Sequence, residues 1–278
     1  MLYLARDGVN DIKYYVSHSA GFTITPVIVR GGGSGTATWD WGDGSALEVG
    51  DDMSHEYATG GPWTVTLTLA NSETYLTSID VNGDHVVGDF LGALRHCRAL
   101  TNVTAHTNAG LNTNCATVNL SGWWPSLVTF YVYSTAVSGD ISGWVLPASL
   151  VYFYVSSTAV SGDISGWVLP ASLQYFRVYS TAVSGAPIFT SAVALDDFRY
   201  QDCVLPAATS NTILARMYAR RASFTALAPA ANLGGTNEKP GGIYQDATPP
   251  TTGLEYKYKL VVDPDAEGFK KWAITTTA

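Results

Sequence analysis

Side chains that could carry out catalysis are sparse in this sequence. Its five histidines are scattered, at positions 18, 55, 85, 96 and 106. None of them belongs to an HExxH zinc motif, and the chain has neither a GxSxG nucleophile turn nor a phosphate-binding loop that ends in lysine. The sequence therefore predicts a protein that is not an enzyme and that needs no cofactor.

One short run of polar residues has part of the spacing of a calcium-binding loop. In DVNGD, oxygen-bearing side chains occupy alternate positions from Asp80 to Asp84. The next residue, however, is His85 where that loop requires glycine, and Leu91 stands where it requires a bidentate glutamate. The sequence therefore excludes a calcium loop at this place.

Three aspartates, Asp196, Asp197 and Asp202, fall on a single predicted strand and its turn. Glycoside hydrolysis needs two carboxyl groups on opposite sides of the scissile bond. The predicted strands between residues 127 and 180 carry no aspartate or glutamate that could serve as the second group. Glycan hydrolysis is therefore disfavoured.

Tyrosine and arginine side chains offer a different chemistry, the recognition of a ligand. They alternate with apolar residues in several predicted strands, so they project from one face of a sheet. Both side chains combine a large contact area with a polar tip, which binding surfaces favour. The predicted ligand-binding residues are Tyr131, Tyr133, Tyr152, Tyr154, Tyr175, Arg177, Tyr179 and Arg199. A second interpretation stays open, because tyrosine is also a good strand residue that can cover a sheet without binding anything.

The elements that must position these side chains belong to a tandem repeat. The seventeen residues STAVSGDISGWVLPASL run from Ser134 to Leu150 and return unchanged from Ser157 to Leu173, 23 residues later. Units of this size cannot bury an apolar face alone, and they stack into a solenoid. Adjacent parallel strands lie about 4.8 Å apart, so the tyrosines and arginines of successive units are expected to form one patch.

An LxxLxL pattern sets the register of six repeats. Its apolar positions are Leu76/Ile79/Val81, Leu100/Val103/Ala105, Leu127/Phe130/Val132, Leu150/Phe153/Val155, Leu173/Phe176/Val178 and Leu195/Phe198/Tyr200. This pattern resembles the leucine-rich-repeat family, and its VSGDISG turns are similar to the plant-like variant, which suggests a member of plant-like, bacterial or phage type. The resemblance implies a parallel sheet on the concave face of a solenoid with few helices, here over residues 74–235.

Two columns of side chains should line the turns of such a stack. The family places asparagine three residues after the last leucine-like position, whereas Thr135, Thr158 and Thr181 stand there in the central copies, and a hydroxyl can make part of the same hydrogen bonds. Asp84, Asn108 and Cys203 occupy that column in the other repeats. A second column, Trp123, Trp144 and Trp167, is expected to be a buried row rather than a sugar-binding platform.

Residues 1–73 are predicted to form a separate antiparallel β domain. FTITPVIV, TATWDW and WTVTLTLA have the apolar patterns of short strands. The segment WDWGDGS from Trp39 to Ser45, followed by HEYATGGPWTVTLTLAN, resembles the PKD domain, an immunoglobulin-like β-sandwich of surface proteins. Asp40 and Asp43 can hydrogen-bond the tight turn that Gly42 permits. A calcium role for these two carboxylates also stays open, although one turn supplies few of the six to eight oxygens that calcium takes.

The end of the chain is predicted to close the solenoid. SNTILARMYARR favours a helix near 210–221 with Ser210 as its N-cap. Residues 236–278 are predicted to form a β-hairpin cap or tail, with TPPTTGLEYKYKL and EGFKKWAITTT as its strands, joined by VVDPDAEG, and Lys257 and Lys259 facing outward. This tail could also mediate contacts between subunits, so an oligomer is considered.

Bulk composition narrows the partners. The net charge is −8 and the pI is about 4.9, so the chain lacks the clustered positive charge that nucleic acids require. Arg6, Asp7, Asp11 and Lys13 interrupt the place of a secretion signal, and no apolar run is long enough for membrane insertion. The cysteines, Cys97, Cys115 and Cys203, show no CxxC spacing and are expected to be small buried residues.

These observations predict a non-enzymatic recognition or adhesion module, part of a phage-tail or cell-surface protein. Its expected partner is a protein or glycan on a cell surface, bound on the concave face. Its expected location is extracellular, on a cell surface or on a virion. The alternative is a structural spacer or assembly protein whose concave face stays empty.

Overall fold

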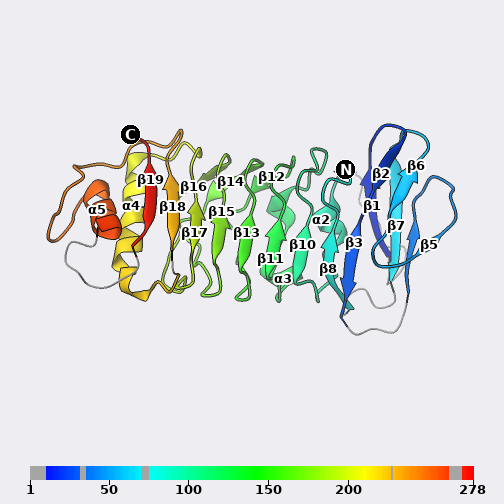
Figure 1. Ribbon diagram of the computed structural model, residues 1–278, viewed down its shortest axis with the longest axis horizontal. Coiled ribbons are helices and arrows are strands. Elements are labelled where there is room, and N and C mark those ends of the chain that lie inside the picture. Colours follow the sequence, from blue (N-terminus) through cyan, green and yellow to red (C-terminus); the bar gives the residue numbers. More distant parts are fainter. Residues whose placement is uncertain (1–10, 32–35, 70–74, 227, 263–270) are drawn as a thin grey trace. The chain divides into compact units, whose positions relative to one another are not determined.

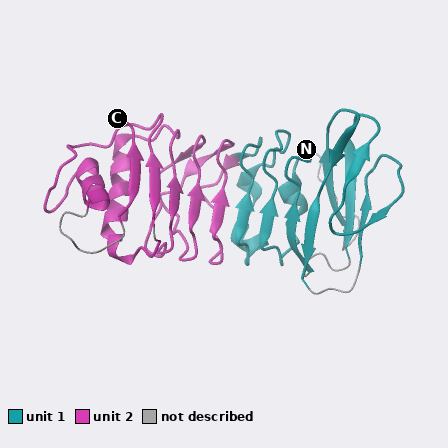
Figure 2. Ribbon diagram, in the orientation of Figure 1, with its two compact units in different colours: residues 1–138 teal, residues 139–278 magenta. Residues whose placement is uncertain are grey.

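The computed structural model describes residues 11–31, 36–69, 75–226, 228–262 and 271–278. The fold is mostly β, with 15% helix (Figure 1). The chain divides into two compact units, residues 1–138 and residues 139–278 (Figure 2). The described part of the second unit begins inside a repeat.

The first unit starts with an antiparallel β domain. Its strands are β1 (Asp11–Val16), β2 (Phe22–Ile24), β3 (Val27–Arg30), β4 (Ala37–Asp40), β5 (Glu48–Val49), β6 (His55–Tyr57), β7 (Trp63–Leu69), β8 (Leu76–Asp80) and β9 (Val86–Val87). One sheet has the order β5-β4-β7-β1-β9, and β2 pairs with β6. Alternate residues of β1 and β7 are buried, which is the pattern expected of strands with one face on a core. The predicted β domain is confirmed.

Strand β8 belongs to two structures at once. It pairs antiparallel with β3 of the β domain and parallel with β10 (Asn102–Thr104), which in turn pairs parallel with β11 (Thr129–Tyr131). The chain then passes to β9, which pairs with β1 in the other sheet. The β domain therefore supplies the first strand of the parallel sheet. The described part of this unit also contains the short helices α2 (Phe90–Ala93), η1 (Cys115–Thr117) and α3 (Leu120–Trp123).

The second unit continues with parallel strands. Its elements are β13 (Tyr152–Tyr154), β14 (Ala159–Asp163), β15 (Tyr175–Arg177), β16 (Ala182–Ser184), β17 (Asp197–Arg199), α4 (Ala207–Ala219), η2 (Arg221–Ser223), β18 (Ala230–Leu233), α5 (Gly253–Val262) and β19 (Ala273–Thr276), while β12 (Ser138–Asp140) spans the division between units. Strands β13, β15, β17, β18 and β19 run side by side and parallel (Figure 1). On another side of the coil, β14 pairs with β16.

The register predicted by the LxxLxL pattern is confirmed. Its six segments contain β8, β10, β11, β13, β15 and β17, and its apolar positions are buried. In the second unit the rings of Phe153, Phe176 and Phe198 stack, with centroids 5.7 and 5.2 Å apart. The architecture is a β-solenoid of about five turns, and each added turn buries its apolar residues against those of the previous one.

Each parallel strand up to β18 ends in the same backbone turn. Two positions after the last buried strand residue, the backbone adopts a left-handed conformation with φ between 54° and 75°. The residues are Gly83, Thr107, Ser134, Ser157, Ser180, Asp202 and Gly235. The N–H groups of five of them, Gly83, Thr107, Ser157, Ser180 and Asp202, donate to a carbonyl of the next turn, as in the bonds from Ser157 to the Tyr179 carbonyl (3.0 Å) and from Ser180 to the Gln201 carbonyl (3.1 Å). The turn therefore fixes both the end of each strand and its spacing to the next.

A side chain next to this left-handed residue satisfies the end of the strand. The hydroxyl groups of Thr135, Thr158 and Thr181 each donate to the carbonyl three residues earlier at 2.6 Å, which confirms the predicted role of this column. Asparagine does more. The Asn108 side-chain oxygen accepts the Val86 N–H, and its nitrogen donates to the carbonyls of Val81 and Ala105.

The predicted tryptophan row is correct for two members and wrong for the third. Trp144 and Trp167 are buried and stack with centroids 6.4 Å apart. Trp123 is only half-buried, and its neighbour Trp124 is fully buried instead, donating its indole N–H to the Leu94 carbonyl at 3.0 Å. The helical turn α3, capped by Asn119, rotates the chain by one position relative to the later repeats.

The closing helix begins earlier than predicted. α4 starts at Ala207 after Pro206, and Ser210 is a fully buried residue inside the helix rather than its N-cap. Proline and two alanines provide a good first turn. The Glu238 side chain, 31 residues away in the sequence, accepts the Ala207 N–H at 2.8 Å, so the local sequence did not reveal where the helix begins.

The predicted C-terminal hairpin is wrong. Residues 253–262 form helix α5, and β19 pairs parallel with β18; the predicted VVDPDAEG connection lies largely outside the described residues. Thr252 and Glu255 have the spacing of a capping box, and Glu255 accepts the N–H groups of Thr251 (2.9 Å) and Thr252 (3.0 Å). Lys259 does not face outward: it is buried and pairs with Asp246 at 2.8 Å.

The duplicated segment contains two glycines in different environments. Gly162 has φ of 118°, and a Cβ there would overlap the Asp140 carboxylate and lie 2.9 Å from the Ser142 nitrogen. Asp140 is held in place because its Oδ1 atom accepts the Ser142 N–H at 2.8 Å. A Cβ at Gly166 would meet nothing within 4 Å.

Gly162→Ala should therefore lower the free energy of unfolding by about 1–3 kcal/mol, through backbone strain and the clash with the previous turn. Gly166→Ala, four residues later, is the matched control and should change stability by less than about 1 kcal/mol. Urea denaturation of both variants measures the difference. Equal stability of the two variants would contradict this account of the stacked turns.

Asp84, the first member of the strand-end column, has a half-satisfied carboxyl group. Its Oδ1 atom accepts the Thr25 N–H at 2.7 Å, whereas Oδ2 is buried without a hydrogen-bond partner among the described residues. Burial raises the pKa of Asp84 to about 7, opposed by the Thr25 hydrogen bond and assisted by Asp80. Because this pKa lies above the unfolded value of 3.8, the stability that Asp84 contributes is fully present below that value and is lost as the pH rises through 7.

Asp84→Asn should raise the free energy of unfolding by about 1–3 kcal/mol near pH 8, because the amide keeps the acceptor for Thr25 and carries no charge. The gain should shrink toward about pH 4, where Asp84 is protonated in the folded protein. Urea denaturation as a function of pH measures both effects.

The matched control is Asn108→Asp, at the same position of the next turn. The Asn108 side-chain nitrogen donates to the carbonyls of Val81 (2.9 Å) and Ala105 (3.1 Å). A carboxylate cannot donate these bonds, so this variant should be less stable than wild type. Destabilisation by Asp84→Asn near pH 8 would refute the assigned role of the column.

Candidate functional site

Two of the predicted ligand-binding residues lie in the first unit. Tyr131 is the last residue of β11, and Tyr133 follows it in the strand-end turn; both side chains are half-buried. The His106 ring stacks on Tyr133 with centroids 4.2 Å apart and meets Tyr131 edge-on at 6.4 Å. Burial lowers the pKa of His106, and the charge of Asp80 opposes this effect. The sequence prediction did not include this histidine.

The other six lie in the second unit, five of them on three neighbouring strands and one in the turn after the second strand. In the parallel register, Tyr152 pairs with Tyr175, Tyr154 with Arg177, and Arg177 with Arg199. Tyr179 lies in the turn after β15. We call the set Tyr152, Tyr154, Tyr175, Arg177, Tyr179 and Arg199 the sheet-face cluster. All six side chains are half-buried, and the buried residues between them anchor the strands in the core.

Ring contacts order this cluster. Tyr152 and Tyr175 stack with centroids 5.0 Å apart and an interplanar angle of 15°. The Arg177 guanidinium lies over the Tyr154 ring, 4.5 Å from its centroid. Such cation–π contacts contribute roughly 0.5–1 kcal/mol at partly exposed positions. The aromatic and cationic side chains are therefore held in defined positions across β13 and β15.

Asp197 joins the two arginines. Its carboxylate accepts a hydrogen bond from Arg177 Nε at 2.7 Å and another from Arg199 Nε. The Asp197 side chain is 8% exposed, whereas the two arginines are 34% and 38% exposed. Burial by itself would lower the pKa of Arg177, but the hydrogen bond and charge of Asp197 outweigh it and raise the pKa. The three charges leave the cluster with one net positive charge.

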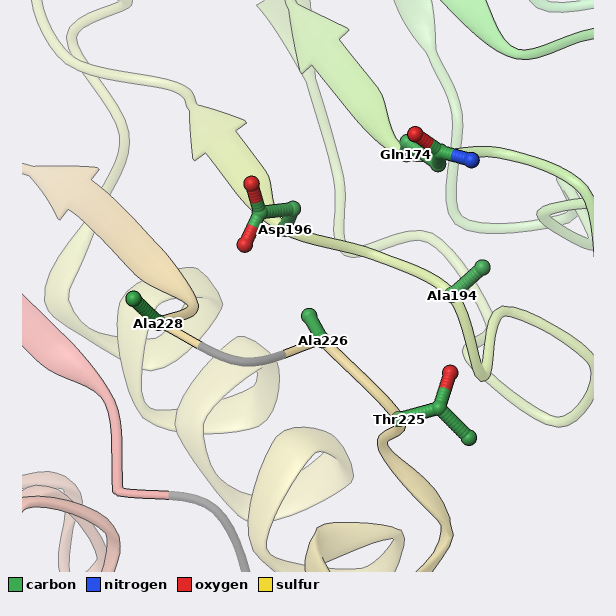
Figure 3. A pocket seen from close by; sticks show the side chains of 6 residues that line it. All are labelled: Gln174, Ala194, Asp196, Thr225, Ala226 and Ala228. Carbon is green, nitrogen blue, oxygen red and sulfur yellow. The ribbon is translucent and has the colours of Figure 1, made fainter.

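A recess lies beside this cluster and was not predicted. It measures about 380 Å³ and is lined by Gln174, Ala194, Asp196, Thr225, Ala226 and Ala228 (Figure 3). Gln174 and Asp196 directly precede β15 and β17, and Thr225 comes from the segment before β18. The LxxLxL pattern contained a signal for Gln174 and Asp196, because the two positions between its first and second apolar residues face away from the core. Nothing in the local sequence linked Thr225 to them.

The WDWGDGS turn of the β domain uses both of its carboxylates structurally. Asp40 accepts the Gly42 N–H at 2.9 Å, and Asp43 accepts the Ser45 N–H at 3.0 Å. Asp43 Oδ2 also lies 2.9 Å from His55 Nε2. Burial opposes the ionised form of Asp43, but the hydrogen bonds from Ser45 and His55 outweigh it and lower the pKa to about 2. The structural interpretation of this turn is therefore confirmed, and its calcium interpretation stays a prediction.

Other candidate chemistry is limited in the part of the chain that the structure describes. Those residues contain no group of three or more His, Cys, Asp or Glu placed to hold a metal ion. None of the described helices combines the length and apolarity needed to cross a membrane. The three cysteines are buried, as predicted, and burial raises the pKa of Cys115 to about 12.

Comparison with known proteins identifies the N-terminal antiparallel β domain. The family model of the PKD domain matches residues 10–81. No curated protein and no solved structure matches the chain. PKD domains are immunoglobulin-like modules that are typically extracellular. The match ends just after β8, the strand that the β domain shares with the parallel sheet, so the chain carries an N-terminal PKD domain that leads directly into a β-solenoid.

Proposed function

We propose that this chain is a non-enzymatic recognition or adhesion module of a cell-surface or phage-tail protein. In this proposal the outward face of the parallel strands, which corresponds to the concave face of a leucine-rich-repeat protein, binds a protein or a glycan. The PKD domain supports an extracellular setting, because such domains are typically found there. The solenoid supports recognition, because stacked repeats create an extended surface.

A comparison of the two duplicated repeats carries the proposal. Their turns are identical, whereas the strands that follow read VYFYVS at 151–156 and QYFRVY at 174–179. The two buried residues of each strand, phenylalanine and valine, are the same in both copies. The changes fall at three other positions, Val151/Gln174, Tyr154/Arg177 and Ser156/Tyr179, and among these residues only Ser156 is buried. The scaffold is copied and the side chains of the face vary, which is what a recognition surface requires.

A structural spacer is the second candidate, and one observation favours it. The sheet-face cluster satisfies its own polar and aromatic groups through the Tyr152–Tyr175 stack and the Arg177–Asp197–Arg199 ion pairs. Such a face needs no ligand to be stable. Binding assays separate the two functions, because a spacer has no affinity that depends on this face.

Tyr154→Ala/Tyr175→Ala should weaken binding to a ligand selected on an array of cell-surface glycans and proteins. Truncation of an aromatic side chain central to an interface costs about 2 kcal/mol or more, so each change should weaken binding at least about 30-fold. The two changes also remove a ring stack and a cation–π contact, so we expect a loss of stability of about 1–3 kcal/mol with the fold retained.

Val145→Ala/Val168→Ala is the control, because these valines occupy equivalent turns of the duplicated repeats and are 65% and 52% exposed. It should bind as wild type does. Thermal melting checks that both double variants are folded at the assay temperature. An unchanged affinity of the tyrosine variant, or the absence of any ligand on the array, would overturn the proposal and favour the spacer.

A further inference from the structure

The recess beside the sheet-face cluster is built by the backbone of three segments. The Gln174 carbonyl accepts the N–H groups of Asp196 (2.8 Å) and Asp197 (3.0 Å), which fixes the starts of β15 and β17 relative to each other. Thr225 donates both its N–H (2.7 Å) and its hydroxyl (3.0 Å) to the Val193 carbonyl. The three polar side chains of the recess are therefore anchored through hydrogen-bonded main chain.

Two polar side chains of this recess, Gln174 and Asp196, are available to a ligand. Leu173 and Phe176 are buried, as are Leu195 and Phe198, so Gln174 and Asp196 lie outside the core at equivalent positions. Among the described residues, neither the Gln174 amide nor the Asp196 carboxylate makes a side-chain hydrogen bond. The alanines of Figure 3 leave the space between them open. Its volume of about 380 Å³ is within the range of small-molecule sites.

The chemistry of the lining selects the class of ligand. A carboxylate only accepts hydrogen bonds, an amide both donates and accepts, and no lysine or arginine lines the recess. An anionic group would be repelled by Asp196, whereas a ligand with several hydroxyl groups satisfies both side chains. Tyr175 does not line the recess, but it follows Gln174 directly in the chain and stacks with Tyr152 on the neighbouring sheet face. Aromatic rings offer an apolar body with a polar tip, which suits a molecule that has both C–H and O–H surfaces.

We propose that the recess binds a neutral hexose unit of a glycan, with Asp196 and Gln174 hydrogen-bonding its hydroxyl groups and Tyr175 contacting its C–H surface. This inference rests on the proposed function and narrows its ligand from protein or glycan to a neutral glycan. The chain of sugars would continue from the recess across the Tyr152–Tyr175 pair.

Asp196→Asn and Gln174→Ala test the proposal in the full chain. The probes are a glycan array and titrations with glucose, galactose, mannose and N-acetylglucosamine, followed by ligand-observed NMR. Wild type should bind at least one neutral sugar. Asp196→Asn replaces a charged acceptor with a neutral one and should bind it about tenfold more weakly, whereas Gln174→Ala loses the hydrogen bonds of a neutral amide and should bind it about two- to tenfold more weakly. Asp163→Asn is the matched control: Asp163 is an exposed aspartate at the end of β14, asparagine keeps its bond to the Ser165 N–H, and binding should not change.

The outcomes separate this inference from the proposed function. Loss of sugar binding in both variants, with melting temperatures equal to wild type, supports it. A ligand that requires Tyr154 and Tyr175 but binds equally well to Asp196→Asn would overturn the hexose site and leave the proposed function standing. Binding only of acidic glycans or of proteins would also overturn it. Absence of any ligand for wild type overturns both.

Discussion

The turn that ends each parallel strand is the constraint on which the solenoid depends. A left-handed residue reverses the chain, and its N–H bonds to the next turn, while the following side chain satisfies the carbonyl at the end of the strand. The left-handed residue and the side-chain hydrogen bond are both needed. A left-handed backbone conformation costs free energy for any residue but glycine, and a buried carbonyl without a hydrogen-bond partner costs more. Ser134, Ser157 and Ser180 are therefore held in the strained left-handed conformation, and the threonine that follows each of them bonds the carbonyl at the end of the strand.

The sequence patterns predicted the parts of the fold that depend on local repetition. LxxLxL located six strands because each buried position recurs one turn later, and the PKD resemblance rested on turn residues that are adjacent in the chain. The prediction was wrong where contacts with residues far away in the sequence determine the secondary structure. Glu238 caps α4 from 31 residues away, and β18, with the sequence AANL, is a strand because β17 and β19 pair with it. Residues 256–259 alternate tyrosine and lysine as an amphipathic strand would, yet the Thr252–Glu255 spacing was a local sign of the helix that was overlooked.

The candidate site was predictable to a similar extent. Alternation along the strands indicated which tyrosines and arginines face outward, and all six members of the sheet-face cluster are half-buried on that face. Alternation could not reveal that Asp197, at the equivalent position to Tyr152 and Tyr175, would bind both arginines and neutralise part of their charge. Nor could it reveal the recess, because Thr225 reaches Gln174 and Asp196 only after α4 has returned the chain to the sheet.

The contacts within the sheet-face cluster bear on how such a surface would bind. Tyr154 and Asp197 hold the Arg177 side chain in place, and Tyr152 and Tyr175 restrain each other. A free arginine would lose roughly 0.5–1.5 kcal/mol of side-chain entropy when a ligand immobilises it, whereas much of this cost has already been met in folding. The contacts that favour a spacer therefore also make the face rigid. A rigid aromatic surface beside a solvent-accessible carboxylate and amide is suited to a ligand with few strong contacts. The Asp196 and Gln174 side chains, which make no side-chain hydrogen bond among the described residues, distinguish the two functions better than the tyrosines do.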